Sequence, residues 1–481
     1  MLFNSFTFMI FLPVVFLLYW FVFKKLRWQN LLILVASYVF YGWWDWRFLI
    51  LIVITSASSF ASGLLIRHFE GHRPVQRAVS AVNIVLNLGI LAVFKYFNFF
   101  VDSLASVLSA VGIAVDWPTM HIILPVGISF YTFQALSYSI DVYARRIEPT
   151  RDGIAFFLFI SFFPQLVAGP IERATNLLPQ MHRERTFDYA VAVDGMRQML
   201  WGFFKKLIIA DGCAEVVNQL WDGMGTATGL MLFIASLLFT FQIYADFSGY
   251  SDIAIGCAKL FGFRLTTNFK VPYFSRNVRE FWRRWHITLM NWFTQYVYFP
   301  LGGSRRGRGR TIVNTLIVFA LSGLWHGADW TFVLWGLYHA LLFIPLILLG
   351  SARYKDTVAH GRLLPTGGEF ASMLLTFLLI NFGWILFRAP DVAGFCDFTS
   401  RLFSPSLFNV HGLTMSMARM LLWCAGLLLV EWVQREREHV LQIDGYRLFS
   451  VQAARLALYA LIAFLIFYFA GKVQTFIYFQ F

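Results

Sequence analysis

The chain has 481 residues, of which 58% are hydrophobic, 19% aromatic and only 14% charged. Soluble domains carry about 25% charged residues, so this composition excludes an ordinary soluble protein and indicates an all-α, polytopic membrane protein. The net charge of +13 is simply explained by an excess of basic residues in cytoplasmic loops, and we expect no nucleic-acid partner.

The first predicted membrane span is the apolar run from Phe6 to Phe23. Lys24, Lys25 and Arg27 follow this run, no basic residue precedes it, and no small-residue cleavage site ends it. We therefore expect a retained span rather than a signal peptide that is removed. Because basic residues favour the cytoplasmic side, the N-terminus is predicted to be extracytoplasmic.

Further apolar segments bring the prediction to about ten to twelve crossings. They lie near residues 31–44, 48–65, 79–101, 122–140, 229–246, 311–326, 331–350, 371–388, 417–433 and 455–472, with shorter candidates at 154–169 and 200–210. A single crossing at 79–101, with residues 103–115 along the outer surface, puts the arginines at 145–151 inside. The basic loops 351–370 and 434–455 are predicted to be cytoplasmic for the same reason.

The middle of the chain breaks this pattern. From Asp246 to Arg310, short apolar stretches alternate with polar ones at 248–252, 268–286 and 301–310. Such segments cannot face lipid, because their backbone groups and charges need partners. We expect them to form re-entrant or interfacial helices, buried in protein or at a cytoplasmic rim around a cavity.

Two histidines in or beside this region are candidate functional residues, His286 in FWRRWHITL and His326 in LSGLWHGADW. Ionisable residues at membrane depth are functional hypotheses by default. Small neighbours of His326 would let a substrate approach its ring, although a histidine that only packs helices together would fit the same sequence. Arg279, Arg283 and His286 have i, i+4, i+7 spacing, which predicts one shared helix face.

The arginines on that face favour a neutral His286. The alternative is an interfacial helix whose arginines extend to the membrane surface and whose tryptophans form a belt. A third histidine, His339, could join His326 only if the helix breaks near Gly327, since 13 residues of straight helix separate two rings by about 20 Å.

Other patterns carry less weight. The H-x-x-x-x-D spacing from His439 to Asp444 is loose and lies in a charged loop without cavity-forming sequence, so we set it aside. Four cysteines lie far apart without any zinc-ligand spacing and indicate neither a disulfide framework nor a metal site. Nucleotide hydrolysis, dinucleotide binding and serine-hydrolase chemistry lose support, because their glycine-rich or nucleophile motifs are missing from the sequence.

A glycine-flanked basic cluster lies at 302–310, between the segments that carry the two histidines. It contains Arg305, Arg306, Arg308 and Arg310. Arginine forks and free backbone N–H groups bind phosphates, but a loop that only sets membrane topology would look the same.

Six stretches together are characteristic of one family. They are LPVGISFYTFQALSYSIDVY at 124–143, FFPQLVAGPIER at 162–173, DFSGYSDIAIGCAKLFGF at 246–263, NFKVPYFSRNVREFWRRWHITL at 268–289, YVYFPLGGSR at 296–305 and LSGLWHGADWTFVLWGLYH at 321–339. At these motifs the chain resembles the membrane-bound O-acyltransferase family, specifically its bacterial alginate O-acetylation branch.

The resemblance implies one membrane domain over residues 1–481 with a tunnel through the membrane. N-terminal helices would occupy 1–121, the catalytic core 122–350 and C-terminal helices 351–481. Acyl-CoA would enter the tunnel from the cytoplasm and the acceptor hydroxyl from the far side. By the family pattern His326 is the catalytic histidine, and His286 stands where relatives carry a second polar residue.

The expected activity is therefore transfer of an acetyl group from cytoplasmic acetyl-CoA, a substrate rather than a permanently bound cofactor, to a hydroxyl on an extracytoplasmic polysaccharide. The branch implies a multi-pass protein of the bacterial inner membrane, in contact with membrane lipid. It also implies a periplasmic SGNH-type acetyltransferase partner, to which acetyl could pass first. The acceptor could be alginate, acetylated cellulose, another exopolysaccharide or peptidoglycan.

In the mechanism we expect, His326 acts as general base on the acceptor hydroxyl, and His286 orients the thioester or stabilises the oxyanion. The residues expected to hold the donor are Arg279, Arg283, Arg305, Arg306 and Trp325. Ser248, Ser251 and Ser322 are possible covalent carriers, but helix packing explains each equally well.

Two other classes of protein remain open from the sequence. A proton-coupled transporter of an anionic solute would use His286 and His326 as relays, and a scaffold of a polysaccharide-export complex would need neither. Against the transporter stand the absence of internal repeats and the crowding of histidine, tryptophan and arginine into 268–339.

Overall fold

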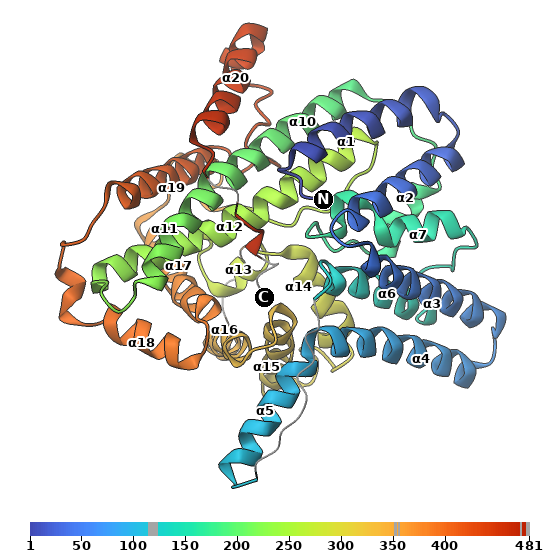
Figure 1. Cartoon of the computed structure of the whole chain (residues 1–481), viewed down its shortest axis with the longest axis horizontal. Helices are drawn as coiled ribbons and strands as arrows, with labels where there is room; N and C mark the ends of the chain where they lie inside the picture. The colour runs from blue at the N-terminus through green and yellow to red at the C-terminus, as the bar shows by residue number, and fades with distance from the viewer. Residues whose placement is uncertain (114–123, 351–353, 355, 472–473, 478–481) are drawn as a thin grey trace. The chain divides into compact units, whose positions relative to one another are not determined.

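The computed structural model describes all residues except 114–123, 351–353, 355, 472–473 and 478–481. The described residues form helices joined by turns and loops, with no strand among them, which confirms the all-α prediction (Figure 1). They divide into two compact units, residues 1–193 with 257–266 and residues 194–256 with 267–481. Each unit is described by itself.

The first unit packs around one helix that is buried along nearly its whole length. Its helices are α1 (Phe6–Leu17), α2 (Leu26–Gly42), α3 (Leu49–His68), α4 (Arg73–Leu91), α5 (Phe97–Ala110), α6 (Ile128–Tyr143), α7 (Gly153–Ser161), α8 (Phe163–Leu166) and α9 (Ala174–Met181). Helix α6 is buried along nearly its whole length and packs against α3 and α4. A Cβ at Gly63 would lie 2.6 Å from the hydroxyl of Tyr138, so α3 needs glycine there to approach α6.

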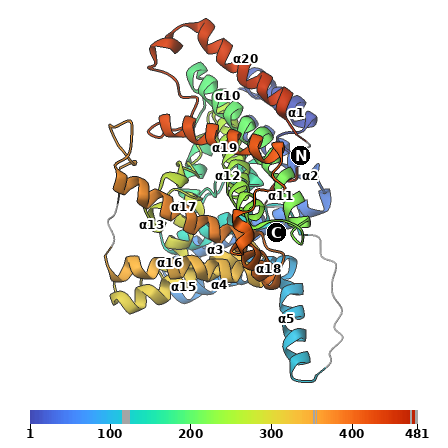
Figure 2. The same cartoon turned by 90° about the vertical axis from the view of Figure 1, so that its left-hand side faces the viewer.

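The second unit contains the longer helices. They are α10 (Tyr189–Phe204), α11 (Asp211–Asp222), α12 (Gly229–Leu260), α13 (Val278–Trp282), α14 (Ile287–Phe293), α15 (Gly307–His326), α16 (Trp330–Leu348), α17 (Gly367–Arg388), α18 (Val392–Leu402), α19 (Met415–Val433) and α20 (Gln452–Phe469). The first residues of α10 and the last four of α12 belong to the first unit. Helices α15 and α16 lie side by side as a hairpin (Figure 2).

Seven of the described helical segments are long and apolar enough to cross a membrane. They are Trp46–His68, Arg73–Ala110, Gly229–Leu260, Trp330–Leu348, Gly367–Arg388, Met415–Val433 and Gln452–Phe469. The chain is thus a multi-pass membrane protein. The spans predicted at 31–44, 122–140 and 311–326 correspond to α2, α6 and α15, which are helical but shorter or more charged, and residues 122–123 lie outside the described residues.

Two boundaries differ from the sequence prediction. Helix α4 continues through a π-helical turn into α5 as one helical segment of 38 residues that bends at this turn (Figure 1), so residue 103 lies inside this segment. Helix α12 does not end at Asp246, as the polar sequence predicted, but continues to Leu260. The polar side chains there are satisfied inside the protein: Asp246 pairs with Lys206 at 2.8 Å, and Ser248 accepts a hydrogen bond from Lys205 at 2.9 Å.

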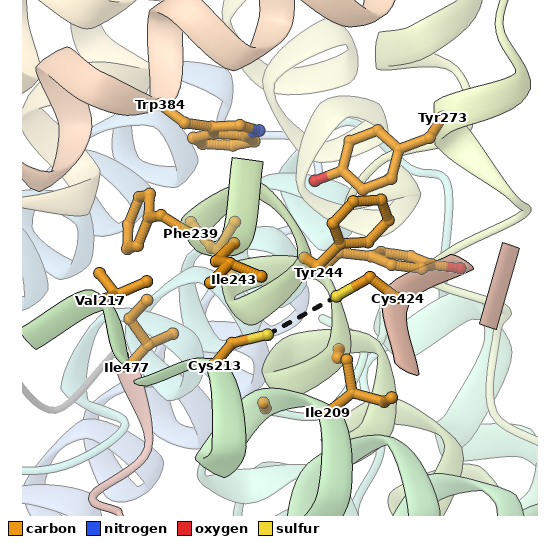
Figure 3. Close-up of a cluster of buried hydrophobic side chains, with 14 of the residues drawn as sticks. Ile209, Cys213, Val217, Phe239, Ile243, Tyr244, Tyr273, Trp384, Cys424 and Ile477 are labelled. Carbon is orange, nitrogen blue, oxygen red and sulfur yellow. Dashed lines mark hydrogen bonds between the residues drawn. The ribbon is translucent and has the colours of Figure 1, made fainter. Parts of the chain in front are cut away.

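The second unit has a buried apolar core to which α11, α12, α17 and α19 contribute (Figure 3). Cys213 and Cys424 are 211 residues apart in sequence, yet their sulfur atoms lie 3.7 Å apart in this core as free thiols. Nearby, the hydroxyl of Tyr273 donates to the carbonyl of Thr240 at 2.6 Å. This bond ties the chain ahead of α13 to the middle of α12.

Candidate active site

His326 ends the first helix of the tightly packed α15–α16 hairpin. Gly327 is extended (φ −155°, ψ 153°) and terminates α15, and the side chain of Asp329 caps α16 by accepting the Thr331 N–H at 2.8 Å. A Cβ at Gly323 or Gly336 would lie 2.1 Å from a carbonyl oxygen of the opposite helix. The two helices therefore touch backbone to backbone, and the hairpin holds the His326 backbone rigidly.

The surroundings of the His326 ring are aromatic. The ring is only 4% exposed, and its centroid lies 4.9 Å from Trp325, 5.0 Å from Trp335 and 5.4 Å from Phe387. All three contacts are edge-on, an arrangement that aromatic pairs prefer. Ring packing from three sides thus helps to orient this side chain.

His286 lies at a junction between two short helices, not on one helix as its spacing predicted. Helix α13 ends at Trp282, and His286 adopts the left-handed conformation (φ 43°, ψ 53°) immediately before α14. The predicted helix face shared with Arg279 and Arg283 is therefore wrong. These arginines bond instead to the carbonyls of Leu346 and Tyr354, each at 3.3 Å.

Backbone hydrogen bonds explain this departure from a continuous helix. The N–H of Ile287 donates to the carbonyl of Asn268, and the N–H of Lys270 donates to the carbonyl of Arg284, both at 3.0 Å. The chain from 268 to 287 thus closes on itself as a loop around α13. This closure requires a turn at His286, for which histidine is one of the better-tolerated side chains.

The side chain of His286 is fully buried and faces an amide. Its Nδ1 atom lies 3.1 Å from Oδ1 of Asn268. Burial lowers the pKa of His286 to about 3, so the ring is neutral at physiological pH, as predicted. The cause is desolvation rather than the neighbouring arginines that the sequence suggested.

Trp325 brings the two histidines together. The centroid of its indole ring lies 5.9 Å from His286 and 4.9 Å from His326. On its other side, His286 contacts Phe247 of α12 at 4.6 Å with perpendicular rings. Two segments separated by 40 residues of sequence thus meet at Trp325, where both histidines lie in one buried, largely aromatic cluster.

A narrow pocket that is partly open to solvent extends from the surface to Asn268. Besides Asn268 its walls include Trp201, Lys205, Tyr244, Ser248, Ser251, Asp252, Ile255, Thr267, Phe269, Lys270, Val271, Glu431, Gln434, Arg435, Arg437, Glu438, His439 and Val440. Lys205 pairs with Asp252 at 2.7 Å, whereas Lys270 and Arg437 are exposed. The pocket connects the immediate partner of His286 to solvent.

Sequence reasoning missed this pocket because its walls come from distant parts of the chain. The loop at His439 was judged to lack cavity-forming sequence, and this judgement is wrong, since His439 lines the pocket. His439 bonds to Asp194 at 2.8 Å, however, and Asp444 pairs with Arg197 at 3.0 Å. The H-x-x-x-x-D pattern therefore does not place its two residues in one catalytic pair.

The basic cluster and the third histidine fall in different places. Arg305 and Arg306 are exposed at the start of α15, about 30 Å along the helix from His326, so the structure does not bring them to the histidines. His339 is nearer than expected, because the helix does break at Gly327. Trp335 touches His326 at 5.0 Å and His339 at 4.9 Å.

Comparison with known proteins extends this description. The sequence profile of the membrane-bound O-acyltransferase family matches residues 150–382. The chain is 38% identical over 394 residues to the probable alginate O-acetylase AlgI of Azotobacter vinelandii, covering 82% of this chain and 76% of that protein. The AlgI protein of Pseudomonas putida is 39% identical over the same length, with 78% of it covered.

A relative with a different named substrate also matches over most of its length. The peptidoglycan O-acetyltransferase of Helicobacter pylori is 33% identical over 422 residues, which cover 82% of this chain and 78% of that protein. All three relatives are named for acetyl transfer, but the polymers in their names differ.

Proposed function

Because this chain belongs to the membrane-bound O-acyltransferase family, and is therefore an acyltransferase, we propose that it moves an acetyl group from cytoplasmic acetyl-CoA to a hydroxyl of an extracytoplasmic polysaccharide. Acetyl is favoured as the acyl group because the similar proteins are named as O-acetylases or O-acetyltransferases. An alginate-like polymer is the first acceptor to test, and peptidoglycan the second.

The observation that carries this proposal is the shared aromatic cluster of His286 and His326. Both rings touch Trp325, and a pocket with many polar residues in its walls reaches Asn268, the hydrogen-bond partner of His286. A buried setting for the two imidazoles suits acyl transfer, because bulk water would otherwise hydrolyse the thioester.

In the proposed reaction, His326 acts as general base. Its imidazole takes the proton of the acceptor hydroxyl as the hydroxyl oxygen attacks the thioester carbonyl. The tetrahedral intermediate then collapses to the ester and expels the CoA thiolate, which takes the proton back from the imidazolium. No net proton is released, so a single base suffices for the whole transfer.

The pocket suggests where the donor's phosphates bind. Lys270 and Arg437 are exposed cations on the pocket walls, whereas Arg279 and Arg283 bond to backbone carbonyls. Guanidinium and ammonium groups bind phosphate strongly. We assign the phosphates of acetyl-CoA to Lys270 and Arg437 in place of the arginines that the sequence suggested, with the pantetheine arm leading toward Asn268.

The cellular setting follows from the same proposal. The enzyme would reside in the bacterial inner membrane with its donor pocket toward the cytoplasm, since the loop that carries Arg437 belongs to a basic stretch. If the polymer itself cannot reach the two histidines, a periplasmic SGNH-type acetyltransferase would receive the acetyl group instead.

Reconstitution tests the proposal. Purified protein in liposomes receives acetyl-CoA outside, and alginate oligosaccharide or muropeptide is enclosed inside. We expect release of CoA and acetyl ester on one enclosed polymer, and no release without an acceptor. Flux of an anionic solute without CoA release would instead support the transporter. The control variant is His411→Ala, which changes an exposed histidine away from His286 and His326.

A further inference from the structure

The orientation of the Asn268 side chain is settled by its neighbours. The backbone N–H of Thr288 lies 3.3 Å from one atom of the amide, and the Thr288 hydroxyl lies 2.9 Å from the same atom. A backbone N–H can only donate, so this atom must be the amide oxygen Oδ1. The amide nitrogen then faces Oγ of Ser251 at 3.4 Å, where it donates.

This orientation determines the tautomer of His286. The same Oδ1 atom lies 3.1 Å from Nδ1 of His286, and a carbonyl oxygen can only accept. Nδ1 must therefore carry the proton. In a neutral imidazole with a protonated Nδ1, the other ring nitrogen, Nε2, carries a lone pair and acts as an acceptor.

We propose that Asn268 is a positioning residue that holds His286 in the Nδ1–H tautomer, so that Nε2 accepts a hydrogen bond from an O–H or N–H group of a substrate. The inference rests on the proposed function and refines it. In this tautomer Nε2 cannot donate to the thioester oxyanion, which was one of the two roles that the sequence suggested, so other donors must stabilise the oxyanion.

The contact is held from several sides. Asn268 is fully buried, and its backbone carbonyl also accepts the N–H of Ile287, so the residue is fixed at both ends. Phe247 packs edge-on against the ring of His286 at 4.6 Å, and Phe269 stacks at 6.4 Å. The imidazole therefore cannot rotate about χ2 without losing the Asn268 contact.

The charged groups around Asn268 are largely compensated. On the pocket walls, Lys205 pairs with Asp252 at 2.7 Å, and Glu431 accepts a hydrogen bond from Tyr244 at 2.8 Å. Lys270, Arg435, Arg437, Glu438 and His439 also line the pocket, whereas Trp325 and Thr288 bring no charge to the ring. A carboxylate placed at position 268 would thus act directly on His286.

The substitution Asn268→Asp tests this assignment. Aspartate can accept the same hydrogen bonds, but its charge stabilises the imidazolium and raises the pKa of His286. Because the protonated ring cannot accept at Nε2, activity should be lost at higher pH than in the wild type. We expect the acidic limb of the kcat/KM profile to move upward by about one pH unit or more.

Two further variants complete the test. Asn268→Leu removes the hydrogen bond and should lower kcat at least about tenfold, because a histidine released from its partner adopts the wrong tautomer. Asn381→Asp places a carboxylate at another buried asparagine of the same unit and should leave the pH profile unmoved. An Asn268→Asp profile that superimposes on the wild type would mean that Asn268 is only structural.

A direct measurement keeps the inference testable if the variants fail to fold. In ¹⁵N-histidine spectra of the full-length protein, signals lost in His286→Gln identify this residue. We expect a protonated Nδ1 and a pyridine-type Nε2, and the reverse pattern would overturn the proposal. If the spectrum is as expected but the wild type transfers no acetyl group, the proposed function fails and the tautomer assignment stands.

Discussion

The segment that carries His286 and the hairpin that carries His326 position their histidines by different means. In residues 268–287, hydrogen bonds from Asn268 and the backbone fix both the main chain and the protonation of the ring. In the α15–α16 hairpin, close backbone contact at two glycines and three edge-on rings fix the position of His326. The first arrangement is built on hydrogen bonds to the ring and its backbone, and the second on close helix packing and aromatic walls.

This difference has a chemical consequence. A general base must exchange a proton during each turnover while its ring stays in place, and the aromatic walls around His326 suit that role. A group that only accepts a hydrogen bond benefits from a fixed tautomer, which suits His286. The comparison therefore predicts which substitutions abolish catalysis and which only weaken binding or stability.

The largest effect is expected for His326→Ala. Loss of the general base should lower acetyl transfer by about 10²- to 10⁴-fold, while expression and membrane insertion stay unchanged. CoA release from acetyl-CoA by purified protein measures the loss. Retained activity in this variant, with the His411→Ala control also active, would remove His326 from the mechanism.

The next effect concerns the hairpin itself. In Gly336→Val, the new Cβ would lie 2.1 Å from the carbonyl oxygen of Phe319, which forces α15 and α16 apart at a cost of about 3 kcal/mol or more. Thermal unfolding in detergent should shift to lower temperature. The control is Gly309→Ala, where a Cβ meets no atom within 4 Å, and this variant should unfold like the wild type. Equal unfolding temperatures of the two variants would mean that the close approach of α15 and α16 is unimportant for stability.

A smaller effect is expected at the donor pocket. The double substitution of Lys270 and Arg437 by alanine should raise KM for acetyl-CoA about tenfold with little change in kcat, because binding is lost equally in ground and transition states. Steady-state kinetics at varied acetyl-CoA measure this. Arg308→Ala, in the exposed basic cluster at the start of α15, is the matched control, and a larger KM effect there would return the phosphates to that cluster.

The smallest effect is expected at His339. This ring is fully buried between tryptophans, and neither of its nitrogens has a hydrogen-bond partner among the described residues. Replacing an unbonded polar side chain by an apolar one of similar size is close to neutral. His339→Leu should keep kcat within about threefold of the wild type, and a loss comparable to that of His326→Ala would give His339 a catalytic role.

The sequence predicted the class of fold well and its local geometry less well. An apolar run predicts a helix whether its side chains face lipid or protein. Helices α16, α17 and α19 therefore lie close to their predicted positions. The polar residues from Asp246 onward predicted a break in the helix, because their partners, Lys205 and Lys206, lie far away in sequence. The helical spacing of the sequence also predicted that His286 lies on a continuous helix. Backbone hydrogen bonding to Asn268 interrupts that helix.

The candidate site could be predicted only in part for the same reason. His286 and His326 stand out as histidines in apolar or aromatic sequence, and the structure brings both to Trp325. Asn268 and the pocket give no local signal, since an asparagine after a threonine pair resembles an ordinary turn. Their function depends on contacts between segments that only the fold creates.

The central claim is that His286 and His326 act together in one reaction at one site. A double-mutant cycle of kcat/KM with His286→Ala, His326→Ala and the double variant tests it most directly. Residues that act as a unit are strongly non-additive, so the double variant should be little worse than His326→Ala alone. Losses that multiply in the double variant would contradict the account, because they would show that the two histidines act independently.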